Sequence, residues 1–188
     1  MNRTRSRVTD AAAFGGYRLA ALTARGLPGF AAQGLAPVLG LGANWSNIDR
    51  RAMIERHLRR ADPTIGGARL RRTVQDAFDS STRYWLESFR LPHLKGAAVE
   101  RGMRVEGYDH VVGALEAGNG VILALPHLGG WEWAGRWLVE RGHGITVVVE
   151  EIEPPELFEW FVDLRQQLGM NVVALGPSAG REAVSYTH

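Results

Sequence analysis

The chain contains no cysteine and a single lysine, Lys95. Without cysteine it cannot form disulfides, thiolate metal sites or a thiol nucleophile. The first nine residues are basic and polar and lead to no compact apolar stretch, so we expect no secretory signal. Gly118-Asn119-Gly120 precedes an expected strand rather than a helix, which indicates a turn and not a phosphate-binding loop. These absences argue against a disulfide-stabilised scaffold and against a nucleotide-binding protein.

The charge of the chain is unevenly distributed. Its 188 residues are 45% hydrophobic and 22% charged, enough for a globular domain with its own core. Residues 1–100 hold 16 Arg and Lys against 8 acidic residues, a net charge of +8, whereas residues 101–188 hold 6 Arg against 12 acidic residues, a net charge of −6. This asymmetry indicates a first half that meets an anionic surface, either a membrane or a nucleic acid, or alternatively a coding bias toward arginine.

Residues 10–43 are apolar and small, but seven glycines and prolines interrupt them between Gly26 and Gly42. We therefore expect two helices, one over 10–25 and one that begins with Pro28 in its first turn. A membrane span, an interfacial hairpin and ordinary helix packing all remain open for this segment.

Two more helices are expected in the first half. One covers residues 46–61 with Ser46 or Asn47 as its cap, and the other covers 68–90. Residues 1–100 are thus predicted to form a basic, helical and membrane-facing region.

From residue 103 the pattern changes to alternating strands and helices. Apolar runs without alternation predict strands that are buried on both faces. The order predicts an α/β fold, in which the helical N-terminal region is followed by a mainly parallel, three-layer sheet, with residues 101–188 as an α/β catalytic region continuous with the first. We expect strands at 103–106, 121–126, 145–150 and 171–175, and helices at 108–117, 131–141 and 156–168.

The segment from His127 to Glu132 carries the candidate chemistry. His127 lies at the carboxyl end of an expected strand, where ligands bind in open α/β sheets. Gly129 and Gly130 leave the backbone bare for a substrate, and the first amides of the next helix favour developing negative charge. A glycine turn can bring the Glu132 carboxylate to the imidazole, which suits a histidine base acting on a hydroxyl. The alternative is a helix-capping glutamate and a histidine bonded to the backbone.

Other chemically active residues carry weaker signals. The remaining histidines show no spacing typical of a metal site, and we expect no metal. Trp131, Trp133 and Trp137 gather on one expected helix, where they pack in the core, form an apolar wall for a substrate or anchor the protein at an interface.

Several stretches resemble a known family. HLGGWEWAG after VILALP resembles the H-x-x-x-x-(D/E) block of the bacterial lipid A lauroyl and myristoyl acyltransferase family, and within it the phosphatidylinositol mannoside acyltransferases. RYWLESFRLP at 83–92, VEGYDHVVGALEAGNGVILALPH at 105–127 and FVDLRQQLGMNVVALG at 161–176 are similar in the same order. The resemblance covers about residues 10 to 180.

This resemblance implies roles for individual residues. His127 and Glu132 would be catalytic, Arg165 would support the site, and Gly129, Gly130 and Trp131 would bind substrate. The implied reaction moves an acyl group from acyl-CoA or acyl carrier protein, with no bound cofactor, to a hydroxyl of a membrane glycolipid such as a phosphatidylinositol mannoside.

The resemblance also implies where the protein works in the cell and which part of the family's sequence this chain represents. Family members work peripherally at the cytoplasmic face of the plasma membrane, which favours an anionic membrane over a nucleic acid as the basic half's partner. Their second half holds a further acidic and arginine block that has no counterpart here. We therefore expect the front portion of such an acyltransferase, with the C-terminal part missing. The alternative is a catalytically inactive fragment that binds membranes or lipids.

Overall fold

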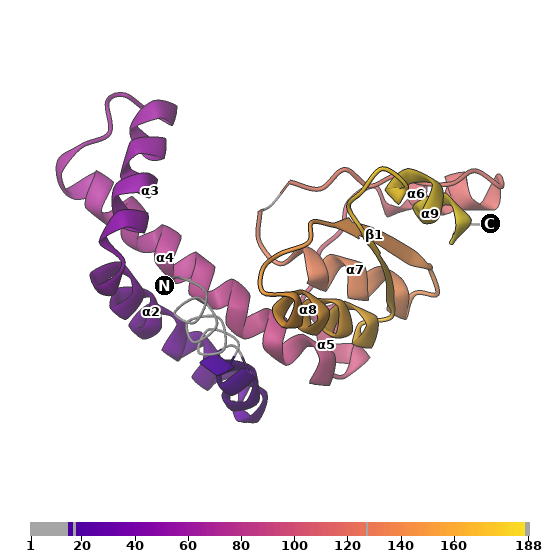
Figure 1. Cartoon of the computed structure of the whole chain (residues 1–188), viewed down its shortest axis with the longest axis horizontal. Helices are drawn as coiled ribbons and strands as arrows, with labels where there is room; N and C mark the ends of the chain where they lie inside the picture. Colours follow the sequence, from indigo (N-terminus) through magenta and orange to yellow (C-terminus); the bar gives the residue numbers. More distant parts are fainter. Residues whose placement is uncertain (1–14, 17, 127, 187–188) are drawn as a thin grey trace, which may run out of the picture. The chain divides into compact units, whose positions relative to one another are not determined.

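The computed structural model describes residues 15–16, 18–126 and 128–186. The chain divides into two compact units (Figure 1). Ala20–Arg90, indigo to magenta, is called the helical unit, and Leu91–His188, pink to yellow, belongs to the α/β unit. Each unit is described by itself below.

The helical unit is built from helices that begin and end where the sequence predicts. Residues 20–26 of this unit are helical, and Pro28 with a φ of −60° precedes α2 (Gly29–Ser46). α3 (Ile48–Ala61) is capped by Asn47, whose side chain accepts a hydrogen bond from the Arg50 backbone N–H at 3.1 Å. The long α4 (Gly67–Arg90) completes the unit.

α2 packs against α4 through its smallest residues. Ala32, Ala36 and Gly40 recur every four residues and are buried, so they share one face of the helix. The large apolar side chains of α2 lie elsewhere: Phe30 and Trp45 are 80% and 81% exposed. No helix in the described part of the chain is both long and apolar enough to cross a bilayer.

The α/β unit begins with a short 3-10 turn, η1 (Leu91–His93), and two short helices, α5 (Gly96–Arg101) and α6 (Tyr108–Glu116). Strand β1 (Ile145–Val149) pairs in parallel with β2 (Met170–Ala174), so that Ile145 lies opposite Met170. Helix α8 (Pro155–Gln167) connects the two strands, as parallel pairing requires. The order after α6 is α7 (Trp131–Glu140), β1, α8 (Pro155–Gln167), β2 and α9 (Ala179–Ser185).

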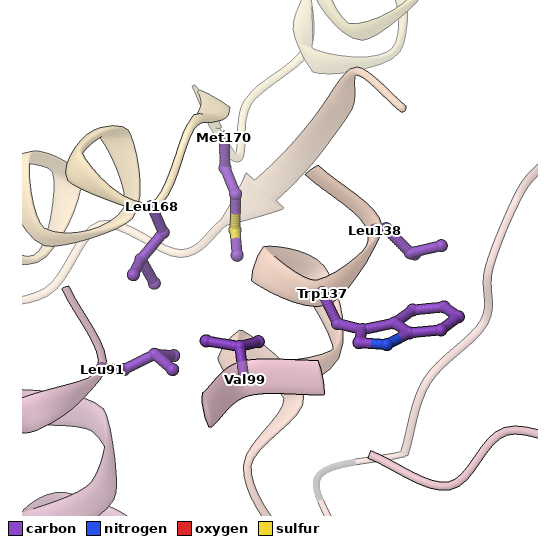
Figure 2. Packing of buried hydrophobic residues seen from close by; sticks show 6 residues of the cluster. All are labelled: Leu91, Val99, Trp137, Leu138, Leu168 and Met170. Carbon is purple, nitrogen blue, oxygen red and sulfur yellow. The ribbon is translucent and has the colours of Figure 1, made fainter. Parts of the chain in front are cut away.

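One buried cluster joins the elements of the α/β unit (Figure 2). Met170 extends from the start of β2 toward Val99 of α5, and Trp137 comes from α7. Gly135 of α7 makes room for the Met170 side chain, because a Cβ at this position would lie 2.4 Å from Met170 Cε. The cluster consists of Leu91, Val99, Trp137, Leu138, Leu168 and Met170.

The sequence predictions of secondary structure are confirmed for most elements. The expected helix at 10–25 is helical at residues 15–16 and from residue 18 onward, and residues 10–14 and 17 lie outside the described residues. Seven further expectations agree with the structure to within two residues: the helices at 46–61, 68–90, 108–117, 131–141 and 156–168, and the strands at 145–150 and 171–175.

The strands expected at 103–106 and 121–126 are wrong, since both segments are irregular. A strand exists only through pairing, and in the described residues β1 and β2 pair only with each other. Apolar character alone therefore misled the prediction for 121–126, whose Ile122 is 96% exposed. The structure supports the coarser α/β description, with two parallel strands where four were expected in a three-layer sheet.

Candidate functional site

The turn that enters α7 is shaped by two glycines. Gly129 has a φ of +71°, a conformation that is strained for residues with a side chain. Gly130 is the N-cap of α7, and its carbonyl oxygen accepts a hydrogen bond from the Trp133 N–H at 2.9 Å. His127, the expected base, lies outside the described residues. The described part of the turn leaves the backbone bare just before the helix, as the sequence suggested.

Glu132 lies in the first turn of α7 and is buried, with 2% of its surface exposed. Its Oε1 is 3.3 Å from Nη2 of Arg165, whose side chain is 13% exposed. Taking a carboxylate out of water is costly unless a cation and hydrogen bonds compensate. Both the arginine and the N-terminal end of the helix favour the ionised carboxylate at this position.

Arg165 reaches Glu132 from the last turn of α8. Its Nη1 donates to the Phe161 carbonyl oxygen at 3.4 Å. Its Cζ lies 4.9 Å from the centroid of the Trp131 ring and 5.6 Å from that of Phe161. The structure thus brings together Glu132, Arg165 and Trp131, three residues singled out in the sequence, although 33 positions separate the ion pair.

Phe161 was not singled out in the sequence. It lies four residues before Arg165 on α8, so the two side chains share a face of the helix. That spacing was a signal available in the sequence. The sequence does not show that Arg165 turns inward to Glu132, however. Without that knowledge, Phe161 resembles any other apolar residue of an amphipathic helix.

The other tryptophans of α7 pack in the core. Trp133 Nε1 donates to the Val99 carbonyl oxygen at 3.0 Å. Trp137 is buried, and its ring meets Tyr108 edge-on at 5.0 Å between centroids. Core packing, rather than an apolar wall for an acyl chain, therefore accounts for both residues.

His143 also has a local role. Its Nε2 shares a 2.5 Å hydrogen bond with the Tyr108 hydroxyl. In the described residues, no three His, Asp or Glu side chains are grouped so that they could hold a metal ion.

Comparison with known sequences identifies the class of protein to which this α/β chain belongs. The sequence model of bacterial lipid A biosynthesis acyltransferases matches residues 8–179. The chain therefore belongs to the bacterial lipid A biosynthesis acyltransferase family, which confirms the resemblance found in the sequence.

Individual relatives are more specific. The phosphatidylinositol mannoside acyltransferase of Mycolicibacterium smegmatis is 36% identical over 169 residues, which are 89% of this chain and 53% of the relative. Proteins of the same name from two strains of Mycobacterium tuberculosis are each 43% identical over 101 residues, which are 53% of this chain and 32% of the relative. The chain thus spans about half, or less, of the length of the curated relatives it matches.

Proposed function

We propose that the chain is part of an acyltransferase that acts on a membrane glycolipid. The donor is an acyl thioester, either acyl-CoA or acyl carrier protein, and the acceptor is a hydroxyl of a phosphatidylinositol mannoside. Family membership supports acyl transfer. The names of the mycobacterial relatives support the choice of acceptor.

In the proposed reaction, His127 is the general base. Its neutral imidazole removes the acceptor's hydroxyl proton while the hydroxyl oxygen attacks the thioester carbonyl carbon. The carbon–sulfur bond then breaks, and the proton passes from the imidazolium to the departing thiolate. The products are a lipid ester and a free thiol, so atoms and charges balance. Positioned proton transfer of this kind contributes about 10²–10⁴-fold to a rate.

The observation that carries the proposal is the buried ion pair of Glu132 and Arg165. An ionised carboxylate near an imidazole fixes its tautomer and stabilises the imidazolium that forms. Glu132 follows His127 by five residues and is separated from it by the glycine turn. The Glu132 carboxylate, held in place by Arg165, therefore supplies a negative charge close in sequence to the proposed base.

The glycines and Trp131 complete the proposed substrate site. At Gly129 and Gly130, a substrate can approach the backbone without meeting a side chain. The N-terminal end of α7 favours negative charge on an attacked carbonyl oxygen, because the helix dipole places partial positive charge there.

The proposal is tested by measuring acyl transfer from a thioester to a mannosylated phosphatidylinositol. We expect His127→Ala to abolish turnover, while His110→Ala, which alters an exposed histidine of α6, leaves turnover unchanged. Circular dichroism controls for folding. Near wild-type turnover in His127→Ala would remove this residue from the mechanism. A folded wild-type chain that binds lipid but transfers no acyl group would favour the second candidate.

The second candidate is an inactive fragment that binds membranes or lipids. The exposed apolar residues of α2 favour it, since Phe30, Val38, Leu41 and Trp45 recur at helical spacing and share one face. Exposed arginines of α3 add positive charge in the same unit. Both candidates include peripheral attachment to an anionic surface, which we propose is the cytoplasmic face of the plasma membrane.

A further inference from the structure

Among the described residues, the Arg165 guanidinium makes two hydrogen bonds, and both are long. Nη2 donates to Glu132 Oε1 at 3.3 Å, and Nη1 donates to the Phe161 carbonyl oxygen at 3.4 Å. Most N–H···O bonds in proteins are about 2.7–3.2 Å long. Nε of Arg165 is buried and has no hydrogen-bond partner among the described residues. Hydrogen bonds alone therefore do not fix this planar group on its flexible stem.

Two aromatic rings supply further contacts. Arg165 Cζ lies 4.9 Å from the Trp131 centroid and 5.6 Å from the Phe161 centroid. A cation within about 6 Å of a ring centroid is attracted when it lies over the ring face. Trp131 directly precedes Glu132 in α7, whereas Phe161 belongs to α8 together with Arg165. The rings thus contact the guanidinium from the helices of both ion-pair partners.

Phe161 is itself held in place. It is buried, and its ring meets Trp160 edge-on, with 4.9 Å between centroids and 74° between planes. Because Phe161 and Arg165 are four residues apart on α8, the helix backbone sets the ring beside the arginine side chain. Phe161 therefore offers Arg165 both a ring and a carbonyl oxygen. A leucine would fill much of the same volume without offering a ring face.

We propose that Phe161 is a positioning residue of the candidate site: together with Trp131, its ring holds the Arg165 guanidinium against the Glu132 carboxylate. The contact itself is independent of the proposed function, but its effect on catalysis rests on that function. Phe161 acts through Arg165 and Glu132 and does not touch the substrate in this role.

The contact is tested by the ¹⁵N–¹H spectrum of the Arg165 side chain in the 188-residue chain. The signal that disappears in Arg165→Lys is assigned to Nε–Hε of Arg165. We expect ring currents to shift this signal from the position of exposed arginines. Phe161→Leu should move it toward that position, and Phe161→Tyr should leave it in place. Phe158→Leu is the matched control on the same helix. An unchanged signal in a folded Phe161→Leu variant would overturn the proposal.

The catalytic consequence is tested in the acyl-transfer assay. Phe161→Leu should lower kcat about 10-fold with little change in the donor KM, and Phe161→Tyr should restore kcat. A shifted Nε–Hε signal with unchanged kcat would overturn the positioning role. If the wild-type chain transfers no acyl group, the proposed function fails, whereas the spectrum still decides whether Phe161 holds Arg165.

Discussion

Gly40 of α2 and Asp79 of α4 lie so close that residue 40 has no room for a side chain. A Cβ at Gly40 would lie 2.9 Å from the Asp79 Cα and 3.0 Å from its backbone nitrogen. These are backbone atoms, so a side-chain rotation cannot relieve the clash. Ala36 and Ala32, one and two turns earlier, continue the same close face. The packing of the helical unit therefore depends on small residues at fixed positions of α2.

The first prediction follows from this contact. Gly40→Ala should destabilise the helical unit by about 1–3 kcal/mol, because α2 and α4 must move apart. Gly34→Ala is the matched control on the same helix, since a Cβ there would meet nothing within 4 Å. Alanine in an exposed helix interior should stabilise by about 0.5–1 kcal/mol. Denaturant unfolding followed by circular dichroism measures both changes. If Gly40→Ala stabilised the protein and Gly34→Ala destabilised it, the packing argument would be contradicted.

The second prediction concerns the buried ion pair. Arg165→Met should cost about 3–5 kcal/mol of stability, because it removes the cation beside the buried Glu132 carboxylate. Glu132→Gln combined with Arg165→Met should cost less than Arg165→Met alone. Glu100→Gln is the control, since it breaks the more exposed pair with Arg141 and should cost under about 1 kcal/mol. A double variant as unstable as the sum of the single variants would show that the two residues do not interact.

The third prediction concerns turnover. Glu132→Gln should lower acyl transfer by about 10²-fold without abolishing it, because glutamine keeps the shape of the side chain and removes its charge. The assay is run across a range of pH. An equal rate for both proteins at every pH would leave Glu132 with a structural role only.

The fourth prediction concerns membranes. The protein should sediment with anionic vesicles and much less with neutral ones, since each arginine near an anionic surface contributes about 1 kcal/mol. Phe30→Ser and Trp45→Ser should weaken binding, because they remove exposed apolar side chains from α2. Leu175→Ser changes an exposed leucine of the α/β unit and should leave binding unchanged. Equal binding to neutral vesicles would contradict an electrostatic contribution, and release only by detergent would contradict peripheral attachment.

The fifth prediction concerns acid stability. The Thr64 hydroxyl donates to Asp62 Oδ1 at 2.6 Å and lowers the pKa of this carboxyl, as do the Thr64 backbone N–H at 3.0 Å and Arg69 at 3.5 Å. A pKa that is lower in the folded state stabilises the protein above the unfolded pKa, and this contribution is lost as the pH falls through the folded pKa. Asp62→Asn should therefore lower the melting temperature near pH 7 and have little effect at strongly acidic pH. Thr64→Val should change the neutral-pH melting temperature in the same direction. A pH-independent difference between Asp62→Asn and wild type would contradict the assignment.

Much of the fold could be predicted because its signals are local. Pro28, Asn47 and the Asp62-Pro63 pair mark helix boundaries in the sequence itself, and they mark them in the structure. The apolar run at 121–126 could not be assigned locally, because a strand is defined by its partner.

The candidate site also has features that local sequence predicts and features that it does not. The glycine turn and the position of Glu132 in a first helical turn were predictable from spacing. The pairing of Glu132 with Arg165 was not, since no local pattern connects residues 33 positions apart. The family resemblance pointed to Arg165 as a supporting residue, but the role of Phe161 emerged only once the structure showed Arg165 turned toward Glu132.

The irregular segment at residues 121–126 has a consequence for handling the protein. It presents five apolar side chains and a proline in succession, and Ile122 is almost fully exposed. Two copies of such a segment can pair backbone to backbone when molecules meet, so self-association should increase with protein concentration. A single charge at residue 122 would oppose that pairing. Ile122→Lys should therefore raise the highest protein concentration at which light scattering still finds a monomer.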